Sequence, residues 1–298
     1  MRLHISLPAQ SLELREDGGH LLRRYAVSTA ARGAGEQAGS YRTPRGRHIV
    51  RAKIGSGLPA DTVFVGRRPT GEIWSPQLQT EHPDRDWILT RILWLSGCEP
   101  GFNRLGAVDT MRRYIYLHGS PDCVAMGEPG SHGCVRMRNA DIVELFDRVP
   151  LGTSVNIVEY ALRCGSWHEL EPLAAAIRRQ VFIEEQGVPA EFEWDDFDAI
   201  SYHALATGPG GEPIATGRLL PDGHLGRFAV LPAWRGKGVG RAVMERLLDE
   251  ADARGLRQLT LHAQTYAEGF YVGFGFVAEG DVFMEAGLPH RQMVRLRC

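Results

Sequence analysis

The sequence predicts two domains of different class, a mostly-β domain over residues 1–160 and an α/β domain over residues 161–298. Length is one reason, because 298 residues are long for one domain and comfortable for two. A change of pattern near residues 160–165 is another, since short alternating runs give way there to strands that alternate with helical patterns. Hydrophobic residues make up 43% of the chain, enough for a core in each half.

The first half consists mainly of strand-like runs bounded by turns. Thr43-Pro44 and Gly46 predict a turn between two strands, and residues 139–149 have helical periodicity with Asn139 as the expected N-cap. The expected strands are 2–7, 11–16, 22–29, 113–119 and a closing strand at 152–160.

The second half alternates strands with helices, which is typical of an α/β fold. A helix over 166–187 should end at Gly187-Val188-Pro189, and an amphipathic helix over 240–256 should end near Gly255. A short helix should open the segment 267–276. The expected strands are 201–208, 212–220, 225–232 and 258–264.

Charge excludes several classes of protein. Thirty-four basic and 36 acidic side chains give a net charge of −2, which argues against a nucleic-acid binder held by a basic field. The sequence contains no run of about 18 apolar residues, so we expect no membrane-spanning helix. The N-terminus resembles a strand more than an export signal, so we expect a cytoplasmic protein, or one that acts in the periplasm after export by an unrecognised route.

The cysteines do not form an expected disulfide framework or metal site. Their number is odd, their positions are scattered, and neither a C-x-x-C pair nor a zinc-like histidine spacing occurs. We therefore expect no metal. The five are Cys98, Cys123, Cys134, Cys164 and Cys298.

The stretch Ser131-His132-Gly133-Cys134-Val135-Arg136-Met137, with His118 upstream in "YIYLHGS", predicts a nucleophilic cysteine. A cysteine attacks as thiolate and needs a base, which His118 could supply. The Gly119 carbonyl could orient that imidazole, the amides of Gly133 and Cys134 could hold an oxyanion, and Arg136 could bind a carboxylate. The alternative is a buried structural cysteine in a turn rich in histidine and glycine.

This pair of segments resembles the L,D-transpeptidase catalytic-domain (YkuD) family, whose mark is a histidine followed by S/T-H-G-C. The likeness extends to "YAVSTA", "TPRG" and "NADIVELFDRVPLGTSVNIVE", and so covers residues 1–159. The resemblance implies a β-sandwich-like catalytic domain with Cys134 as nucleophile, His118 as base and the Gly119 carbonyl as orienting group. Pocket-shaping roles would fall to Ser131, His132, Gly133 and Arg136.

By that resemblance, Cys134 attacks an amide carbonyl beside a diaminopimelate centre in a peptidoglycan stem peptide. D-alanine leaves, a thioester forms, and an amine or water takes the acyl group, so that the product defines a transpeptidase or an L,D-carboxypeptidase. Family members usually act outside the cytoplasmic membrane and many carry a wall-binding module, whereas we expect neither an export signal nor such a module from the residues given. A cytosolic enzyme acting on recycled muropeptides and a non-catalytic glycan-peptide binding module are the alternatives.

Other side chains of this half have weaker indications. The segment 88–106 is expected to build one wall of the cleft. Arg91 and Arg113 could meet an acidic substrate, although pairing or solvation is more common for such arginines. Cys98 and Cys123 are expected to be bystanders.

In the second half, a strand, a bend and a helix surround the sequence "RGKGVG". Successive glycines let backbone N–H groups converge on a pyrophosphate, and the helix dipole favours the negative charge. The spacing fits neither a Walker loop nor a dinucleotide fingerprint, and a plain strand-to-helix turn is the alternative.

This half resembles the GNAT acetyltransferase superfamily, whose acetyl-CoA loop is R-x-x-G-x-G/A. The segment "FYVGFGF" and the stretches at 177–206 and 280–293 are similar to its ElaA-like branch, over residues 163–298 in all. The resemblance implies that Tyr271 protonates the departing CoA thiolate, with core packing as the alternative. Acetyl-CoA would be the co-substrate, with the pyrophosphate held by Arg235, Gly236, Lys237, Gly238, Val239 and Gly240 and the pantetheine paired with Phe228, Ala229 and Val230.

The base that accepts the amine proton is open at this point. Each candidate is by itself more often structural: Glu184, Glu185, Asp281, Glu285 and His290. His262 on its strand is expected to be a core histidine. The acidic run of Glu191, Glu193, Asp195, Asp196 and Asp198 could attract a cationic acceptor, with a solvated loop as the alternative. The branch tends to have an acid where Ala286 stands.

Taken together, the residues predict a bifunctional acyltransferase with peptidoglycan peptides or muropeptides and a small amine acceptor as partners. The very short linker between the halves motivates the hypothesis that both act on related amine-bearing, wall-derived molecules.

Overall fold

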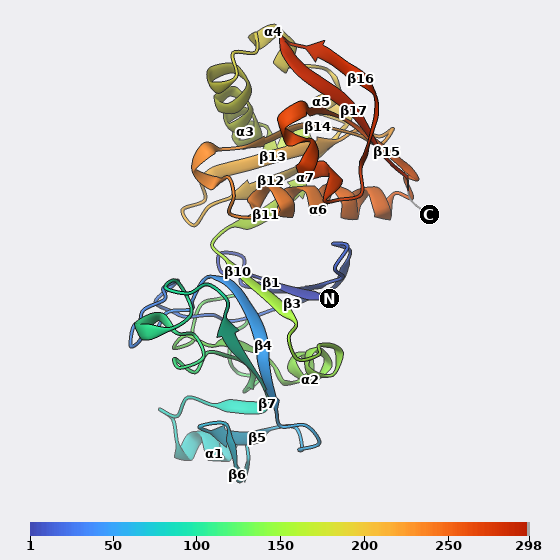
Figure 1. The fold of residues 1–298 in the computed structure, drawn as a ribbon. Coiled ribbons are helices and arrows are strands. Elements are labelled where there is room, and N and C mark those ends of the chain that lie inside the picture. Colours follow the sequence, from blue (N-terminus) through green and yellow to red (C-terminus); the bar gives the residue numbers. More distant parts are fainter. Residues whose placement is uncertain (297–298) are drawn as a thin grey trace. The chain divides into compact units, whose positions relative to one another are not determined.

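The computed structural model describes residues 1–296, and Cys298 lies outside them. The chain divides into two compact units, Met1–Glu159 and Tyr160–Cys298, shown in Figure 1. Each unit has its own sheet. The described free cysteines are Cys98, Cys123, Cys134 and Cys164.

The N-terminal unit is rich in strands. Its strands are β1 (Arg2–Ser6), β2 (Ser11–Arg15), β3 (Leu21–Ala26), β4 (Gly46–Ile54), β5 (Thr62–Val65), β6 (Arg68–Ile73), β7 (Ile88–Gly97), β8 (Tyr116–Ser120), β9 (Val135–Arg138) and β10 (Ser154–Val158). Its helices are α1 (Pro76–Glu81), the 3-10 turn η1 (Gly106–Val108) and α2 (Asn139–Arg148).

These ten strands form one hydrogen-bonded ladder in the order β3-β2-β1-β10-β4-β7-β5-β6, with β8 paired to β7 and β9 to β8. The structure therefore shows a β-rich domain, and the β-sandwich arrangement stays a prediction. The segment expected to form a cleft wall, 88–106, contains β7, which pairs with β4, β5 and β8 at the middle of the sheet.

Helix α2 covers one face of this sheet because Ile142, Leu145 and Phe146 recur at helical spacing and are buried. Asn139 is its first helical residue and does not cap it, since the residue before the helix is Arg138 and no side chain makes a cap bond there. The Asn139 amide instead bonds Asp61 and accepts from Thr90 Oγ1. The predicted N-cap was wrong because tertiary partners take up the side chain.

The C-terminal unit alternates strands and helices. Its strands are β11 (Ala161–Gly165), β12 (Tyr202–Thr207), β13 (Pro213–Leu219), β14 (His224–Val230), β15 (Gln258–Gln264), β16 (Val277–Glu285) and β17 (Leu288–Leu296). Its helices are α3 (Trp167–Arg178), the π-helix η2 (Arg179–Glu185), α4 (Ala190–Glu193), α5 (Phe197–Ile200), the 3-10 turn η3 (Pro232–Trp234), α6 (Val239–Ala253), the 3-10 turn η4 (Thr265–Ala267) and α7 (Glu268–Val272).

The seven strands follow the order β11-β12-β13-β14-β15-β17-β16. Every residue of β13 after Pro213 is buried, and both α3 and α6 pack against this strand, so both faces of the sheet are covered. Ser166 begins α3 with a capping box that involves Glu169. The long helix expected over 166–187 is α-helical only to Arg178 and continues as the π-helix η2.

The parallel pair β14 and β15 determines where the cavity of this unit lies. Only His224↔Thr260 and Leu225↔Leu261 are paired, and beyond these residues the two strands separate. Arg227 has a φ of 49°, and the register with β13 shifts at the same place, as in a β-bulge. The backbone of β14 past Leu225 is therefore not paired with β15.

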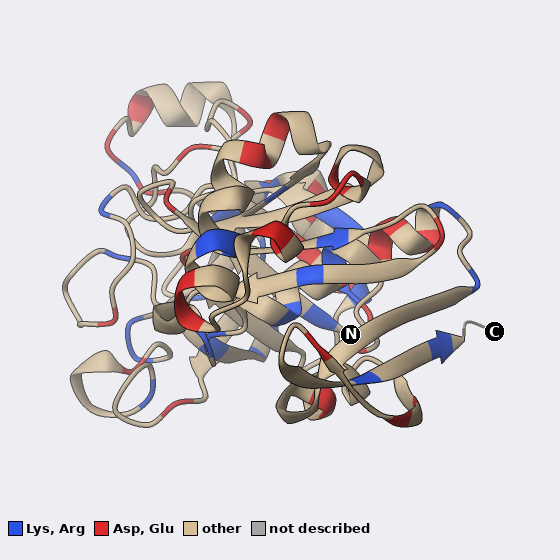
Figure 2. Ribbon diagram, turned by 90° about the horizontal axis from the view of Figure 1, so that it is seen from above, with Lys and Arg blue, Asp and Glu red and all other residues tan. Residues whose placement is uncertain are grey.

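Basic and acidic residues are interspersed along the ribbon (Figure 2). Among the helices of residues 1–296, none has the length and apolar character that crossing a bilayer requires.

Candidate active sites

In the N-terminal unit, the register of two parallel strands determines which side chains meet. Leu117 lies opposite Val135, and His118 lies opposite Arg136. Leu117, Val135 and Met137 point into the main core, where they are fully buried. Because side chains alternate along a strand, His118 and Arg136 point to the other face.

Cys134 belongs to that other face. It packs beside Tyr116 in a second apolar cluster, and its Sγ lies 3.4 Å from the Tyr116 N–H and 3.4 Å from the Tyr114 carbonyl oxygen. The thiol therefore accepts one backbone bond and donates another. Since Tyr116 and His118 are two residues apart on one strand, Cys134 and the imidazole share a face.

His118 is almost completely buried, and its Nδ1 lies 2.8 Å from the Gly119 carbonyl oxygen. The carbonyl can only accept, so Nδ1 carries the hydrogen and Nε2 has the free lone pair. Gly119 must be glycine, because a Cβ would collide with Asn139 Oδ1 and the Leu89 carbonyl. The small residue thus lets the strand approach its neighbours while its carbonyl fixes the imidazole.

Burial controls the ionisation of both groups. It lowers the pKa of His118 from its ordinary 6.5 to about 4, against the opposing bond to Gly119. Burial likewise raises the pKa of the Cys134 thiol to about 12, against the opposing bond from the Tyr116 N–H. The resting pair is a neutral thiol and a neutral imidazole.

The turn 131–134 is held from several sides. Ser131 Oγ donates to the Cys134 carbonyl at 2.5 Å and accepts from the Gly133 N–H at 3.2 Å. Thr43 Oγ1 donates to the Gly133 carbonyl at 3.0 Å. Gly133 has a φ of 131°, a conformation that favours glycine. The Gly133 N–H is already bonded to Ser131, so it would have to leave that bond to donate to an oxyanion. The Cys134 amide is therefore the simpler donor.

One carboxylate that the sequence analysis did not single out joins two of the predicted residues. Asp86 accepts from Arg136 at 2.6 Å and lies 3.1 Å from His132 Nδ1. Arg136 also donates to the Gly130 carbonyl, so its guanidinium is bound within the loop. Burial alone would raise the pKa of Asp86, but His132 and Arg136 together hold it below its ordinary value.

Arg91 and Arg113 both have backbone partners, and the charge of Arg113 lies near enough to Cys134 to favour its thiolate. Arg113 donates to the carbonyls of Gly35, Glu36 and Arg42, and Arg91 donates to those of Leu58 and Thr90. Both arginines therefore hold loops together.

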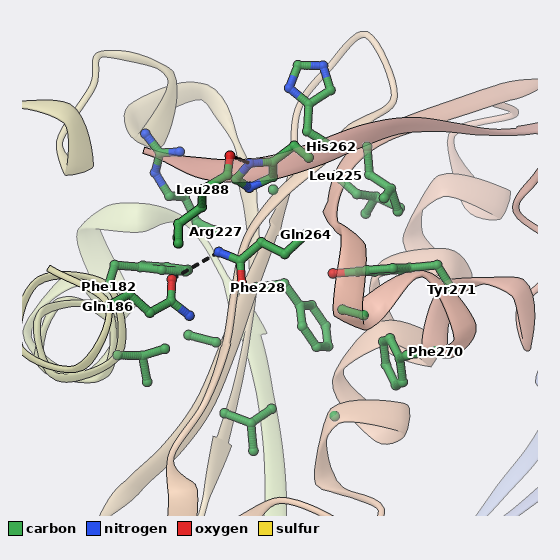
Figure 3. A pocket seen from close by; sticks show the side chains of 18 of the residues that line it. Phe182, Gln186, Leu225, Arg227, Phe228, His262, Gln264, Phe270, Tyr271 and Leu288 are labelled. Atoms are coloured by element: carbon green, nitrogen blue, oxygen red, sulfur yellow. Dashed lines mark hydrogen bonds between the residues drawn. The ribbon is translucent and has the colours of Figure 1, made fainter. Parts of the chain in front are cut away.

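The C-terminal unit contains a cavity of about 810 Å³ where β14 and β15 separate, shown in Figure 3. Of the residues predicted to hold acetyl-CoA, seven line it: Phe228, Ala229, Val230, Arg235, Gly236, Gly238 and Gly240. Two others do not, because Val239 is fully buried and the Lys237 ammonium lies over the Trp234 ring at 5.1 Å.

The loop before α6 has the backbone needed for an anion. Gly236 and Gly238 have φ values of 73° and 81°, which permit the loop to present its amides, and Gly238 is the N-cap of α6. A Cβ at Gly240 would make ordinary van der Waals contact with Val230 and Phe228, so the start of the helix lies close to β14. These residues fit a pyrophosphate at the helix N-terminus.

Arg235 has protein partners in this structure. Its guanidinium forms a bidentate pair with Glu185, at 2.7 Å for both bonds, and its Nε donates to the Val230 carbonyl at 3.0 Å. A pyrophosphate bound by Arg235 would compete with Glu185 for the same donors.

Tyr271 is placed at the cavity by α7. Its ring packs against Phe228, Phe270 and Phe276, and in Figure 3 its hydroxyl points into the cavity. Burial raises the pKa of Tyr271, so the hydroxyl keeps its proton at neutral pH. Tyr271 therefore packs against the aromatic cluster with its ring and also presents a protonated hydroxyl to the cavity, so the two predicted roles are compatible.

The other end of the cavity is polar. His224, His262, His290 and Glu285 line it, and His262 Nδ1 lies 3.0 Å from Glu285 Oε2. Gln264 Nε2 donates to Gln186 Oε1 across the cavity at 3.0 Å. His262 is not a core histidine, because 38% of its side chain is exposed. Among residues 1–296, no three His, Cys, Asp or Glu side chains are arranged to share a metal ion.

The acidic run is largely neither solvated nor free for an acceptor. Its inner carboxylates are buried or half-buried in ion pairs with three arginines that come from α3, β13 and β14. The pairs join Arg178 to Glu193 and Asp198, Arg218 to Asp195 and Asp198, and Arg227 to Glu193 and Asp195. The solvated-loop interpretation was wrong for these three acids, since nothing in the spacing of 191–198 points to the distant arginines, and Glu193 is the one of them that lines the cavity.

Comparisons with known proteins assign the two units separately. The L,D-transpeptidase catalytic domain (YkuD) family matches residues 1–157, and the GNAT acetyltransferase domain family matches residues 175–297. The N-acetyltransferase YjcF of Bacillus subtilis is 38% identical over 123 residues, which are 40% of this chain and 87% of YjcF. The protein ElaA of Escherichia coli is 31% identical over 127 residues, covering 40% of this chain and 82% of ElaA.

Among solved structures, an acyl-CoA N-acyltransferase from Pseudomonas aeruginosa is 31% identical, with a TM-score of 0.42, and covers 46% of this chain and 99% of that one. GNAT domains use acetyl-CoA or another acyl-CoA, and the family match makes the C-terminal unit an acyltransferase of this kind. Given the family matches and the YjcF and ElaA relatives, the chain belongs to the YkuD-type L,D-transpeptidase family through its first half and to the GNAT acetyltransferase family, with ElaA-like relatives, through its second.

Proposed function

We propose that the chain is a bifunctional acyltransferase. The first unit would transfer a peptidoglycan stem peptide through a Cys134 thioester, and the second would transfer acetyl from acetyl-CoA to a small amine. The cysteine activity is supported mainly by the β8–β9 register, which puts Cys134 on the same face of the sheet as His118. The bond from His118 Nδ1 to the Gly119 carbonyl leaves Nε2 free to accept a proton.

The cysteine reaction follows from the neutral state of the pair. As Sγ attacks the amide carbonyl, the thiol proton passes to His118 Nε2, so no free thiolate is needed before substrate binds. The imidazolium then gives that proton to the departing amine of D-alanine, and a thioester remains on Cys134. An incoming amine completes transpeptidation, and water completes L,D-carboxypeptidation.

Two groups support this chemistry from the turn. The Cys134 amide is the simplest donor to the oxyanion, because Ser131 and Thr43 hold the turn rigid around it. Asp86 orients Arg136 and His132 beside the nucleophile. A rigid turn of this kind costs little reorganisation during the reaction.

The test uses a disaccharide tetrapeptide that ends in D-alanine, with and without a second stem peptide as acceptor. We expect release of D-alanine, with a dimer formed in the presence of acceptor and a tripeptide in its absence. A carbapenem should form a stable adduct, and peptide mapping by mass spectrometry should locate it on Cys134. No release and no adduct would indicate a module that only binds glycan-peptide.

The acetyl-transfer half is supported by the cavity between β14 and β15. The amides of Gly236 to Gly240 and the start of α6 would hold the pyrophosphate. The β14 backbone near Phe228, on the edge that is not paired with β15, would hold the pantetheine. Acetyl-CoA supplies the activated acyl group. Tyr271 would give its hydroxyl proton to the departing thiol sulfur.

The corresponding test measures CoA binding by calorimetry and then screens amines with labelled acetyl-CoA. The panel comprises D-glucosamine, meso-diaminopimelate and muropeptides with free amino groups, because the fusion of the two units suggests a shared wall-derived substrate. Acetylation of at least one of these is expected. Binding of CoA with acetylation confined to unrelated amines would separate the substrates of the two units.

A further inference from the structure

The acceptor end of the cavity contains a polar pair that neither family assignment explains. His262 and Glu285 both line the cavity and lie 3.0 Å apart, on β15 and at the end of β16. His262 directly follows Leu261, the last residue of β15 paired with β14. The imidazole therefore lies where the two strands begin to separate, at the start of the space proposed for the thioester.

We infer that His262, held by Glu285, is the general base that takes the proton from the acceptor amine. This inference rests on the acetyl transfer proposed above. A primary ammonium gives a proton to His262 Nε2, its nitrogen then bonds the acetyl carbon, and the carbon–sulfur bond breaks. The sulfur receives its proton from Tyr271. The new amide nitrogen loses its second proton, which restores the Tyr271 hydroxyl through solvent, and the imidazolium releases the first amine proton to solvent.

The tautomer supports this role. A carboxylate is only an acceptor, so the 3.0 Å contact places the hydrogen of His262 on Nδ1. Nε2 then carries the lone pair that a base needs. Glu285 also stabilises the imidazolium that forms, in the way that an acid partner supports a catalytic histidine. Glu285 is a positioning residue in this arrangement.

The surroundings hold both side chains in place. The His262 ring packs edge-to-face against the rings of Phe283 and His224, with centroid separations of 4.9 Å and 5.1 Å. Glu285 precedes a tight turn in which Ala286 and Gly287 have φ values of 47° and 77°, so the β16–β17 hairpin determines its position. Ala286, which stands where related proteins are expected to have an acid, forms part of this turn. The neighbouring Glu285 supplies the carboxylate.

The neighbouring titratable groups do not offer an equivalent base. Burial and the charge of His262 lower the pKa of His224, whose Nδ1 lies 3.0 Å from Thr260 Oγ1. His290, from β17, is buried, and its Nδ1 bonds the Leu288 carbonyl. Of the earlier candidates, Glu185 is paired with Arg235, and Glu184 and Asp281 do not line this cavity.

The first experiment needs no acceptor. Nitrogen-15 NMR of histidine-labelled protein should show His262 as the Nδ1–H tautomer when neutral, and Glu285→Gln should shift that signal because Nδ1 loses its carboxylate partner. Glu285→Asp should restore part of the shift. An Nε2–H tautomer in the wild-type protein, or an unchanged signal in Glu285→Gln, overturns the inference.

The second experiment follows CoA release from acetyl-CoA with D-glucosamine, with meso-diaminopimelate and with water alone. His262→Gln should lower kcat/KM about 10²-fold near neutral pH, with the KM for acetyl-CoA within about twofold, and should abolish the acid limb of the pH profile. His168→Gln, on the exposed side of α3, is the matched control and should behave as wild type.

The outcomes are distinguishable from failure of acetyl transfer itself. Absence of CoA binding in the wild type would remove the proposed function. Normal binding together with a His262→Gln rate within about threefold of wild type, and an unchanged acid limb, would remove the base assignment alone.

Discussion

The two candidate sites are built in opposite ways. Around Cys134, the reacting groups lie on two adjacent strands and one turn, and hydrogen bonds within 131–134 hold them. In the C-terminal unit, the groups come from η2, β14, β15, α7 and the β16–β17 hairpin around an open cavity of about 810 Å³. The reacting residues of the first site are close together in the sequence. Those of the second site are far apart in the sequence and meet only in the folded domain.

The largest effect is expected from a substitution of the nucleophile, Cys134. Cys134→Ala should lower D-alanine release at least about 10³-fold, because no other group of the turn can form the thioester. Acetyl transfer should be unchanged. Cys123→Ser, an exposed cysteine beside Gln79, is the matched control. Loss of both activities from Cys134→Ala would contradict two independent sites.

At the cavity, a single change should have a smaller effect. Tyr271→Phe should lower kcat for acetyl transfer about 10²-fold with little change in the KM for acetyl-CoA, because ring packing is kept and only the proton donor is lost. Steady-state kinetics measures this split, with the exposed Tyr266→Phe as control. A raised KM with normal kcat would instead indicate a packing role.

Asp86→Asn tests whether residues outside the Cys134 turn contribute to the first site. We expect kcat/KM for D-alanine release to fall about tenfold, because Arg136 and His132 lose a charged hydrogen-bond partner. Alkylation of Cys134 by iodoacetamide should become faster, since the Asp86 charge no longer opposes the thiolate. Parallel losses in both assays would mean that the loop has simply unfolded.

Glu185→Gln tests the loop at the start of α6. Removing the carboxylate frees Arg235 for the pyrophosphate, so CoA should bind about two- to fivefold more tightly by calorimetry. Glu184→Gln, at the exposed neighbouring position, should leave the Kd unchanged. Weaker binding in Glu185→Gln would mean that the ion pair shapes the loop for its ligand.

The smallest effect is expected from pH. His118, with a pKa near 4, is neutral at all higher pH, and Cys134, with a pKa near 12, stays a thiol at all lower pH. The kcat/KM for D-alanine release should therefore vary less than about twofold between about pH 6 and 8. A tenfold rise over that range would show that His118 titrates near its ordinary value.

The contrast also explains what the sequence could predict. Alternation and helical periodicity located most strands and helices, since each reflects local burial. The turn around Cys134 was recognisable because its members are adjacent or one strand apart. The capping role of Asn139 was wrongly predicted because Asp61 and Thr90, far away in sequence, take its side chain.

Residues brought together only by the sheet could not be predicted. Asp86 precedes β7 and reaches Arg136 across 50 positions, with no pattern to indicate it. His262 and Glu285 are 23 positions apart and meet because β16 and β15 both flank β17. A lone histidine on a strand is more often a core residue, and only the separation of β14 from β15 exposes this one.

The buried network of Arg178, Arg218 and Arg227 with three carboxylates has a consequence for how such an enzyme can diversify. Deleting a buried member such as Arg178 leaves the Glu193 and Asp198 carboxylates away from water with fewer partners, at a cost of about 3–5 kcal/mol. Natural variation on that side of the cavity would have to replace several residues at once, which makes it evolutionarily rigid. New acceptor preferences should therefore arise first at uncharged lining positions such as Gln186, Phe192 and Leu288, where one substitution reshapes the entrance without disturbing the fold.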